Sequence, residues 1–214
     1  ATYTYRYDGS SNFGPDNRWA GFHSAAVSWR FSNEKFFESL RSVISNGKLR
    51  IGWGQTGNSN IGGYAWGSAI TRMPNIANTS IKWESQEQWN VGIDLGFIQD
   101  RINLTLDWYK KTSNDMLMPL QLPSYMGTQG NGSSALAAPK GNYGSIENTG
   151  IEVTLNTHPI VGRFEWDSDL QISFNKNKLK ALSGTTSAAI IGYGQWSDVV
   201  SLSEVGSSLY NFYG

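Results

Sequence analysis

Apolar and polar residues alternate strictly along the middle of the chain, in two arms at residues 89–97 and 101–111. The apolar positions are Trp89, Val91, Ile93, Leu95 and Phe97, then Ile102, Leu104, Leu106 and Trp108. A period of two residues predicts β-strands that each have one apolar and one polar face. The three residues between the arms, 98–100, can join only antiparallel neighbours. The sequence therefore predicts a long β-hairpin.

The same alternation predicts further strands on both sides of this hairpin. They are expected at residues 3–7, 18–31, 49–53, 151–155, 164–174 and 205–213. Residues 32–48 differ, because their apolar side chains recur at helical spacing behind Ser32, a suitable N-cap, and they predict a short amphipathic helix. Stretches rich in glycine, asparagine and proline predict loops at 58–82, 116–145 and 176–201, and a brief turn from His158.

Short and long connections alternate between these strands. The reversals after residues 97 and 157 are short, and the connections after residues 57, 111 and 175 are long. In an antiparallel meander this alternation places the long loops at one end and the short turns at the other, as in outer-membrane barrels. The predicted helical connection from Ser32 is an exception on the short-turn side. The pattern predicts an all-β, antiparallel transmembrane β-barrel segment of about eight strands.

Composition limits the classes of function. The 214 residues carry 17 basic and 17 acidic side chains, and this balance argues against general nucleic-acid binding. The absence of cysteine excludes a disulfide framework, a thiol nucleophile and a cysteine-ligated zinc site. Mean hydropathy is −0.39, and no apolar run reaches the length of a transmembrane helix. Alternating strands cancel in such averages, so these values do not argue against a membrane barrel.

Motifs that could carry chemistry have simpler explanations. Residues 52–57 match a dinucleotide fingerprint by letter, but the Asn- and Gly-rich continuation will not start the helix that this motif needs. His23 and His158 have no metal-ligand partner at helical spacing. Glu165, Asp167 and Asp169 could form a carboxylate pair of the glycosidase kind, although a polar row inside a barrel explains them as well. We expect no catalytic residue, cofactor or metal.

Two sets of side chains are candidates for contact with water and ligand. The acidic residues expected to face a barrel lumen are Asp94, Asp107, Glu152, Glu165, Asp167 and Asp169. The loop aromatics that could stack on sugar rings or hold peptide side chains are Tyr64, Trp66, Tyr125, Tyr143, Tyr193 and Trp196. Alternatively, these aromatics pack within the loops or against a partner protein.

Several motifs in a fixed order resemble the SusC/RagA family of TonB-dependent transporters. They are residues 8–14 (DGSSNFG), 17–19 (NRW), 28–30 (SWR), 48–58 (KLRIGWGQTGN), 82–84 (KWE), 90–94 (NVGID), 101–102 (RI), 109–112 (YKKT), 148–152 (NTGIE) and 175–178 (NKNK). The resemblance covers nearly the whole chain. It implies that residues 1–214 are part of a barrel domain of roughly 22 strands. An N-terminal plug domain would lie outside this segment.

The resemblance also implies a function in the bacterial outer membrane. It predicts TonB-energised uptake of oligosaccharides or oligopeptides, with a SusD-like lipoprotein at the extracellular mouth and TonB acting through the plug. Outer-membrane lipid would surround the apolar face. Two other classes stay open on the pattern alone: a small closed barrel of the porin or adhesin type, and a soluble carbohydrate-binding β-sandwich.

Overall fold

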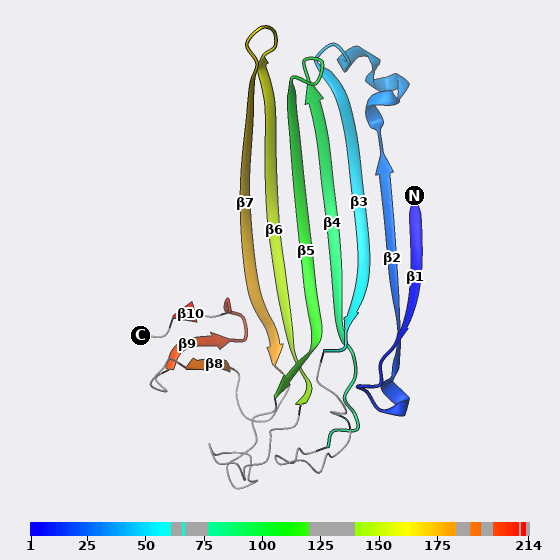
Figure 1. The fold of residues 1–214 in the computed structure, drawn as a ribbon, viewed down its shortest axis with the longest axis vertical. Helices are drawn as coiled ribbons and strands as arrows, with labels where there is room; N and C mark the ends of the chain where they lie inside the picture. Colours follow the sequence, from blue (N-terminus) through cyan, green and yellow to red (C-terminus); the bar gives the residue numbers. More distant parts are fainter. Residues whose placement is uncertain are drawn as a thin grey trace.

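Seven long strands form one antiparallel sheet in the order β1-β2-β3-β4-β5-β6-β7 (Figure 1). This computed structural model describes residues 1–60, 66, 77–119, 140–182, 189–193, 199–209 and 211–212. The strands are β1 Thr2–Gly9, β2 Trp19–Trp29, β3 Ile44–Asn58, β4 Glu84–Phe97, β5 Ile102–Pro119, β6 Lys140–Ile160 and β7 Trp166–Leu182. A second, small sheet contains β8 Ala189–Tyr193, β9 Val199–Glu204 and β10 Asn211–Phe212. The prediction of an all-β antiparallel fold is confirmed.

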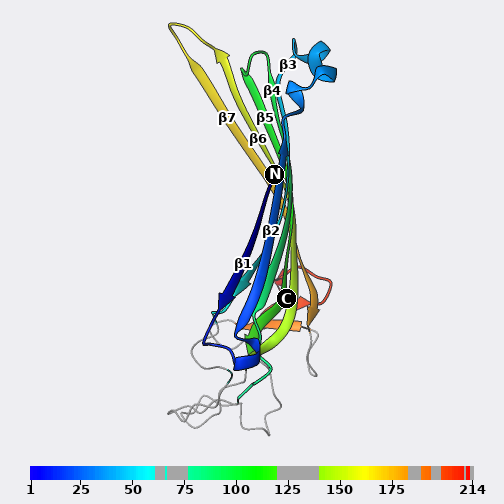
Figure 2. The ribbon, with the colours of Figure 1, turned by 90° about the vertical axis from the view of Figure 1, so that its right-hand side faces the viewer.

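The seven strands lie in a single curved layer. Seen from its side, the sheet has no second layer of described strands against either face (Figure 2). Among the described strands the sheet is open, because β1 pairs only with β2, and β7 pairs within this sheet only with β6. Leu179 of β7 also exchanges backbone hydrogen bonds with the turn after β9, at 2.9 Å to the Ser207 carbonyl and 2.8 Å from the Gly206 amide. A soluble sandwich would need a second sheet over the first.

The connections confirm the predicted alternation. The β2–β3, β4–β5 and β6–β7 connections lie at one end of the sheet, and the β1–β2, β3–β4 and β5–β6 connections leave from the other (Figure 1). We call these the short-turn end and the long-connection end. The helical connection between β2 and β3 lies at the short-turn end, as its sequence position predicts.

The predicted tight reversal between β4 and β5 has an unusual backbone. Ile98, Gln99 and Asp100 have φ angles of 52°, 57° and 63°, in the left-handed region that costs roughly 1–2 kcal/mol for most residues. Ser45 stabilises this turn from β3. Its hydroxyl donates to Asp100 Oδ1 at 2.6 Å and accepts from the Asp100 amide at 3.0 Å.

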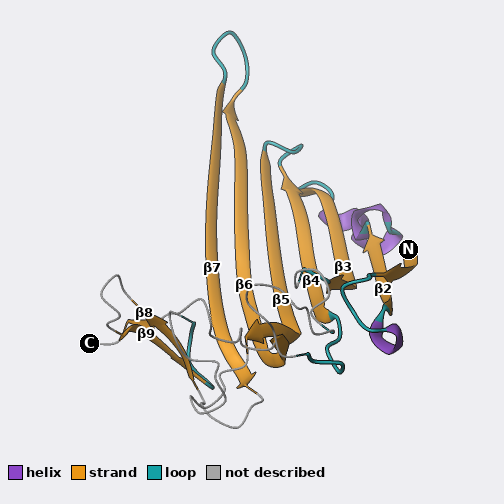
Figure 3. Ribbon diagram, turned by 60° about the horizontal axis from the view of Figure 1, so that its bottom comes forward, coloured by secondary structure: helices purple, strands orange, loops and turns teal. Residues whose placement is uncertain are grey.

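The α-helix predicted at 32–48 is wrong. This connection contains two short 3₁₀ helices, η2 Phe31–Asn33 and η3 Lys35–Leu40, and β3 already begins at Ile44 (Figure 3). A third, η1 Pro15–Asn17, lies between β1 and β2. Glu34 separates the two helices in an extended conformation, with φ −79° and ψ 150°. Aromatic side chains of the two short helices pack against each other. Phe31 and Phe37 meet edge to face, with centroids 5.3 Å apart.

Strands extend further than the loop predictions allowed. β5 continues to Pro119 and β6 begins at Lys140, so the connection predicted at 116–145 is shorter. The turn predicted from His158 is also wrong, because β6 runs on to Ile160. Pro159 is accommodated there because the register with β7 shifts between Thr157 and Ile160.

The C-terminal predictions are wrong as well. Residues 176–201 are not one loop, because β7 continues to Leu182 and β8 and β9 follow. The strand predicted at 205–213 is largely absent among the described residues. A turn follows Glu204, with Gly206 at φ 96°, and only Asn211–Phe212 pair as a strand. Glycine and asparagine suggest loops locally, but pairing with a neighbouring strand outweighs that preference.

Little of the described chain forms a hydrophobic core. The buried apolar residues are Phe13, Phe22, Phe37, Ile81, Ile146 and Leu179. Phe13 and Ile81 form a small cluster at the long-connection end, where Trp66, Trp83 and Leu117 pack against them. No helix in the described ranges is both long enough and apolar enough to cross a membrane.

Candidate functional site: the two faces of the sheet

One face of the sheet is apolar from β2 to β7. The register places apolar residues side by side in rows that cross these strands. One row contains Val27, Ile51, Val91, Trp108, Ile151 and Phe174. The next contains Trp29, Leu49, Ile93, Leu106, Val153 and Ile172. Val27 is 54% exposed and Phe174 is 67% exposed. An apolar surface this continuous is typical of contact with a membrane or a large partner.

Two tryptophans mark where this apolar face ends toward the long connections. Glu87 Oε1 accepts a hydrogen bond from Trp53 Nε1 at 2.7 Å and another from Trp89 Nε1 at 3.1 Å. Beyond them the same face becomes polar, because Gln55 and Thr112 flank Glu87 on the neighbouring strands. Indole rings with an apolar body and a satisfied N–H are typical of the membrane–water interface.

The opposite face is polar over the same strands. One row contains Ser28, Arg50, Gly92, Asp107, Glu152 and Ser173, and the next contains Lys48, Asp94, Thr105, Thr154 and Gln171. Three of the predicted polar residues, Asp94, Asp107 and Glu152, therefore share one face. Asp169 joins them through its pairing with Asn156.

An ionic cluster links three strands at the centre of the polar face. Arg50 of β3 binds Asp94 of β4 through two hydrogen bonds, Nε to Oδ2 at 2.8 Å and Nη2 to Oδ1 at 2.9 Å. The same Nη2 lies 2.9 Å from Asp107 Oδ1 on β5. Thr105 Oγ1 donates to Asp94 Oδ1 at 3.2 Å. A planar guanidinium suits this double pairing, whereas a lysine would supply only a point charge.

Gly92 allows the second of these ion pairs to form. It lies between Arg50 and Asp107 in the same row. A Cβ atom at Gly92 would lie 2.2 Å from Asp107 Oδ1 and 2.7 Å from Arg50 Nη2. Neither Arg50 nor Gly92 was among the predicted site residues. The sequence feature that could have pointed to them is the placement of charged residues within 48–50 and 92–94. These charges form a cluster only once the strands are paired in register.

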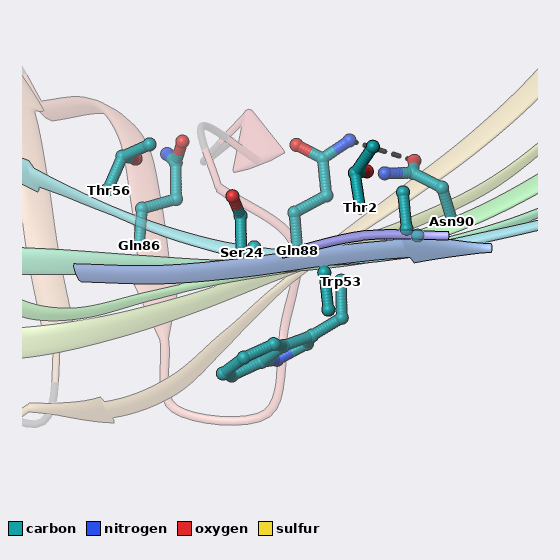
Figure 4. A pocket seen from close by; sticks show the side chains of 11 residues that line it. Thr2, Ser24, Trp53, Thr56, Gln86, Gln88 and Asn90 are labelled. Atoms are coloured by element: carbon teal, nitrogen blue, oxygen red, sulfur yellow. Dashed lines mark hydrogen bonds between the residues drawn. The ribbon is translucent and has the colours of Figure 1, made fainter. Parts of the chain in front are cut away.

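A shallow hollow of uncharged hydrogen-bonding groups lies beside this cluster. Figure 4 shows Thr2, Ser24, Thr56, Gln86, Gln88 and Asn90 on one side of the sheet and Trp53 on the other. The hollow has a volume of about 310 Å³. Gln88 Nε2 donates to Asn90 Oδ1 at 2.9 Å. A Cβ atom at Gly52 would contact nothing within 4 Å, so the floor is open. Amides and hydroxyls can bind sugar hydroxyls or peptide groups equally.

The acidic row predicted on β7 is only partly formed. Asp169 lies on the polar face, and Asp167 Oδ1 lies 2.6 Å from His158 Nδ1. Glu165 lies outside the strand, in the turn before Trp166, so the prediction that all three share one strand face is wrong for Glu165. His158 is partly exposed to solvent in this pair with Asp167. In the described ranges, no group of side chains could hold a metal ion.

The structure places the predicted loop aromatics in different surroundings. Tyr64, Tyr125 and Trp196 lie outside the described residues, and Tyr193 belongs to β8. Trp66 packs against the Phe13–Ile81 cluster, and its indole nitrogen has no hydrogen-bond partner among the described residues. Tyr143 is half-buried on β6 and folds over Gly141, where a Cβ atom would lie 2.1 Å from its ring.

The two-faced sheet agrees with a known family. A family model described as "TonB dependent receptor-like, beta-barrel" matches residues 1–211. The chain belongs to the TonB-dependent receptor β-barrel family. The resemblance to SusC/RagA-type receptors predicted from the motifs is confirmed, and this receptor chain is located in the bacterial outer membrane.

Individual relatives agree with this assignment. The TonB-dependent receptor SusC of Bacteroides thetaiotaomicron is 37% identical, over 86% of this receptor chain and 19% of the relative. The TonB-dependent receptor P39 of Formosa agariphila is 34% identical, over 100% of this chain and 20% of the relative. The solved RagAB peptide transporter superposes with a TM-score of 0.81 at 25% identity, covering 97% of this chain and 23% of that one. The chain thus spans about a fifth of these relatives' length.

Proposed function

We propose that this chain forms part of the wall of an active transporter, which imports oligosaccharides or oligopeptides across the outer membrane with energy delivered by TonB. The observation that carries the proposal is the single-layer sheet, with one continuous apolar face and one polar face that holds the Arg50 cluster. In a membrane barrel the apolar face meets hydrocarbon and the polar face lines a wet lumen. We assign this chain no catalytic step and no cofactor.

The proposed partners rest on the relatives. A SusD-like lipoprotein would close the extracellular mouth, and TonB would act through an N-terminal plug domain. Residues 1–214 would then belong entirely to the barrel domain, which further strands would complete to roughly 22. The sheet's edges support this arrangement, because among the described strands nothing pairs with the outer edge of β1 and only the turn after β9 bonds to β7, and an unpaired edge inside a bilayer would leave backbone groups unsatisfied.

Ligand contact is proposed at two places. The amides and hydroxyls of the hollow beside Arg50 would face the lumen and bind uncharged polar groups of a passing ligand. The loop aromatics would contact it at the mouth, which the long-connection end forms in this orientation. The residues proposed for this second role are Tyr64, Trp66, Tyr125, Tyr143, Tyr193 and Trp196.

The orientation of the two faces can be tested by cysteine labelling. We expect Asn90→Cys to react with a charged, membrane-impermeant maleimide in isolated outer membranes, because Asn90 would face water. Its neighbour Val91→Cys should remain unlabelled until the membrane is dissolved and the protein unfolded, since its thiol would face hydrocarbon. The described register puts these two residues on opposite faces of one strand, which makes them a matched pair. Equal labelling rates in membranes would contradict the orientation.

Transport itself is tested by growth and uptake. Deleting the gene that encodes this chain should abolish uptake of either a fluorescent oligosaccharide or a fluorescent oligopeptide, and removing TonB should abolish the same uptake. Size-matched solutes that enter through general porins serve as the control. Uptake that persists without TonB would favour the passive barrel of the porin type. The class of solute lost identifies the substrate.

A further inference from the structure

Lysines gather on the apolar-face side of β7, immediately beyond the hydrocarbon-like rows. Along this strand Phe174 is followed on the same face by Lys176 and then Lys178, because Phe174 pairs with Ile151, Lys176 with Thr149 and Lys178 with Glu147. Lys180 continues the group along β7, and Lys110 of β5 extends it across β6. We call Lys110, Lys176, Lys178 and Lys180 the lysine patch. It lies on the lipid-facing side of the barrel only in the proposed orientation, so a lipid site there rests on the proposed function.

The charges in the lysine patch are not balanced. Glu147 is the carboxylate between them, and its Oε2 lies 3.1 Å from Lys110 Nζ and 3.5 Å from Lys180 Nζ. Lys176 and Lys178 are exposed and form no ion pair with any residue in the described ranges. Glu87 of β4 is a second carboxylate on the same face, next to Lys110, so four lysines with two carboxylates leave a local excess of positive charge. Solvated lysines alone would need no ligand, but these adjoin an apolar hollow.

That hollow lies directly next to the lysine patch. It has a volume of about 270 Å³ and is lined by Trp108, Thr149, Gly150, Ile151, Phe174, Asn175 and Lys176. Trp108 and Phe174 flank Ile151 in one row of the apolar face. One end of the hollow is therefore hydrocarbon-like, and the other offers an ammonium group and the Thr149 hydroxyl. This polarity matches an amphiphile with an apolar tail and an anionic head.

The position of the lysine patch along the strands indicates which leaflet of the outer membrane it would contact. Lys176, Lys178 and Lys180 lie in the last part of β7, which ends at Leu182. Lys110 lies at the middle of β5, in the same row as Lys176 through Thr149, so the lysine patch extends from the middle of the sheet toward the long-connection end (Figure 1). Outer-membrane barrels place their long loops outside the cell. The lysine patch would thus lie level with the lipid head groups of the outer leaflet, where Trp53 and Trp89 mark the interface on neighbouring strands.

The geometry points to a binding site for a phosphate-bearing lipid of the outer leaflet. Its acyl chain lies over Ile151 between Trp108 and Phe174, and its phosphate binds Lys176 and Lys178. Lys110 and Lys180, held by Glu147, add to the positive field. Attraction of this kind falls with ionic strength, because lysine acts on the phosphate as a point charge at the membrane surface.

The test uses the native protein extracted from outer membranes and exchanged into nanodiscs. The probes are phosphorylated lipid A, the same lipid after enzymatic dephosphorylation, and inorganic phosphate, with retained lipid counted by native mass spectrometry. The variant K176Q/K178Q removes two charges while keeping unbranched, polar side chains that are one atom shorter. The matched control K48Q/K111Q removes two charges from the opposite face, where Lys111 pairs with Gln88 and Asn148.

We expect the wild type to prefer phosphorylated lipid A, and K176Q/K178Q to weaken its binding by about tenfold to thirtyfold. K48Q/K111Q should keep the preference, and inorganic phosphate should not compete at equal concentration. Unchanged preference in K176Q/K178Q, or equal loss in K48Q/K111Q, would overturn the lipid site while leaving the transporter assignment intact. Competition by free phosphate would reduce the site to a simple anion patch and overturn it too. A wild type that remains monodisperse without detergent would instead contradict the proposed function.

Discussion

Replacing Leu106 by lysine is expected to lower the free energy of unfolding by about 2–4 kcal/mol, the cost of a cation near the middle of a barrel's lipid face. Leu106 lies in the central apolar row, between Ile93 and Val153 on the neighbouring strands. The lysine side chain cannot reach water easily from that depth. Denaturant titration of the protein refolded in phospholipid vesicles measures the change.

Two control substitutions place the same lysine at a different depth in the membrane or on the other face of the sheet. Ile102→Lys lies on the same strand and face but at the short-turn end, where the cost should fall to about 0–1 kcal/mol. Thr105→Lys adds the same charge on the polar face, beside Asp94, and should be tolerated. A cost that is the same at Leu106 and Ile102 would remove the support for hydrocarbon contact. If lysine lowers the free energy of unfolding more at Thr105 than at Leu106, the assignment of the lipid-facing and lumen-facing sides must be exchanged.

The second large effect is expected from Arg50→Met. This change removes the cation that holds Asp94 and Asp107 together and leaves two carboxylates facing each other. Breaking a fully buried pair costs about 3–5 kcal/mol. The side chains here are 37%, 28% and 32% exposed, so water will screen part of the repulsion. We expect a loss of about 1–3 kcal/mol in the free energy of unfolding, in the same vesicle assay.

Two further variants isolate the ionic origin of that loss. Arg6→Met breaks the pair with Asp8, at 2.7 Å, where the arginine is 57% exposed, and should cost only about 0–1 kcal/mol. Combining Arg50→Met with Asp94→Asn and Asp107→Asn removes the uncompensated carboxylates and should recover most of the stability. If the triple variant is no more stable than Arg50→Met alone, the arginine contributes by packing its stem rather than by its charge.

Secondary-structure predictions from the sequence succeeded where two neighbouring strands both showed clear alternation of apolar and polar residues. The turn of the β4–β5 hairpin and the strand ends beside it were predicted to within a residue, because both arms alternate and the connection is short, although β4 begins earlier and β5 ends later than predicted. They failed where the local signal was weak or ambiguous. The helix predicted at 32–48 rested on the helical spacing of Phe36, Phe37, Leu40, Val43 and Ile44, but the segment forms two short 3₁₀ helices and Ile44 already pairs with Phe97 of β4. The loop predicted at 176–201 rested on asparagine and glycine, but β6 offers β7 a ladder as far as Leu182.

The sequence by itself determined that strands dominate, that each has an apolar and a polar side, and that long and short connections alternate. It could do so because side-chain direction in a strand depends only on the parity of the residue number. Only the tertiary structure decided which residues become neighbours across strands. A shift of one residue in any pairing would move every side chain of that strand to the other face. The Arg50 cluster and the lysine patch therefore exist only through the register of three strands each, which no single stretch of sequence contains.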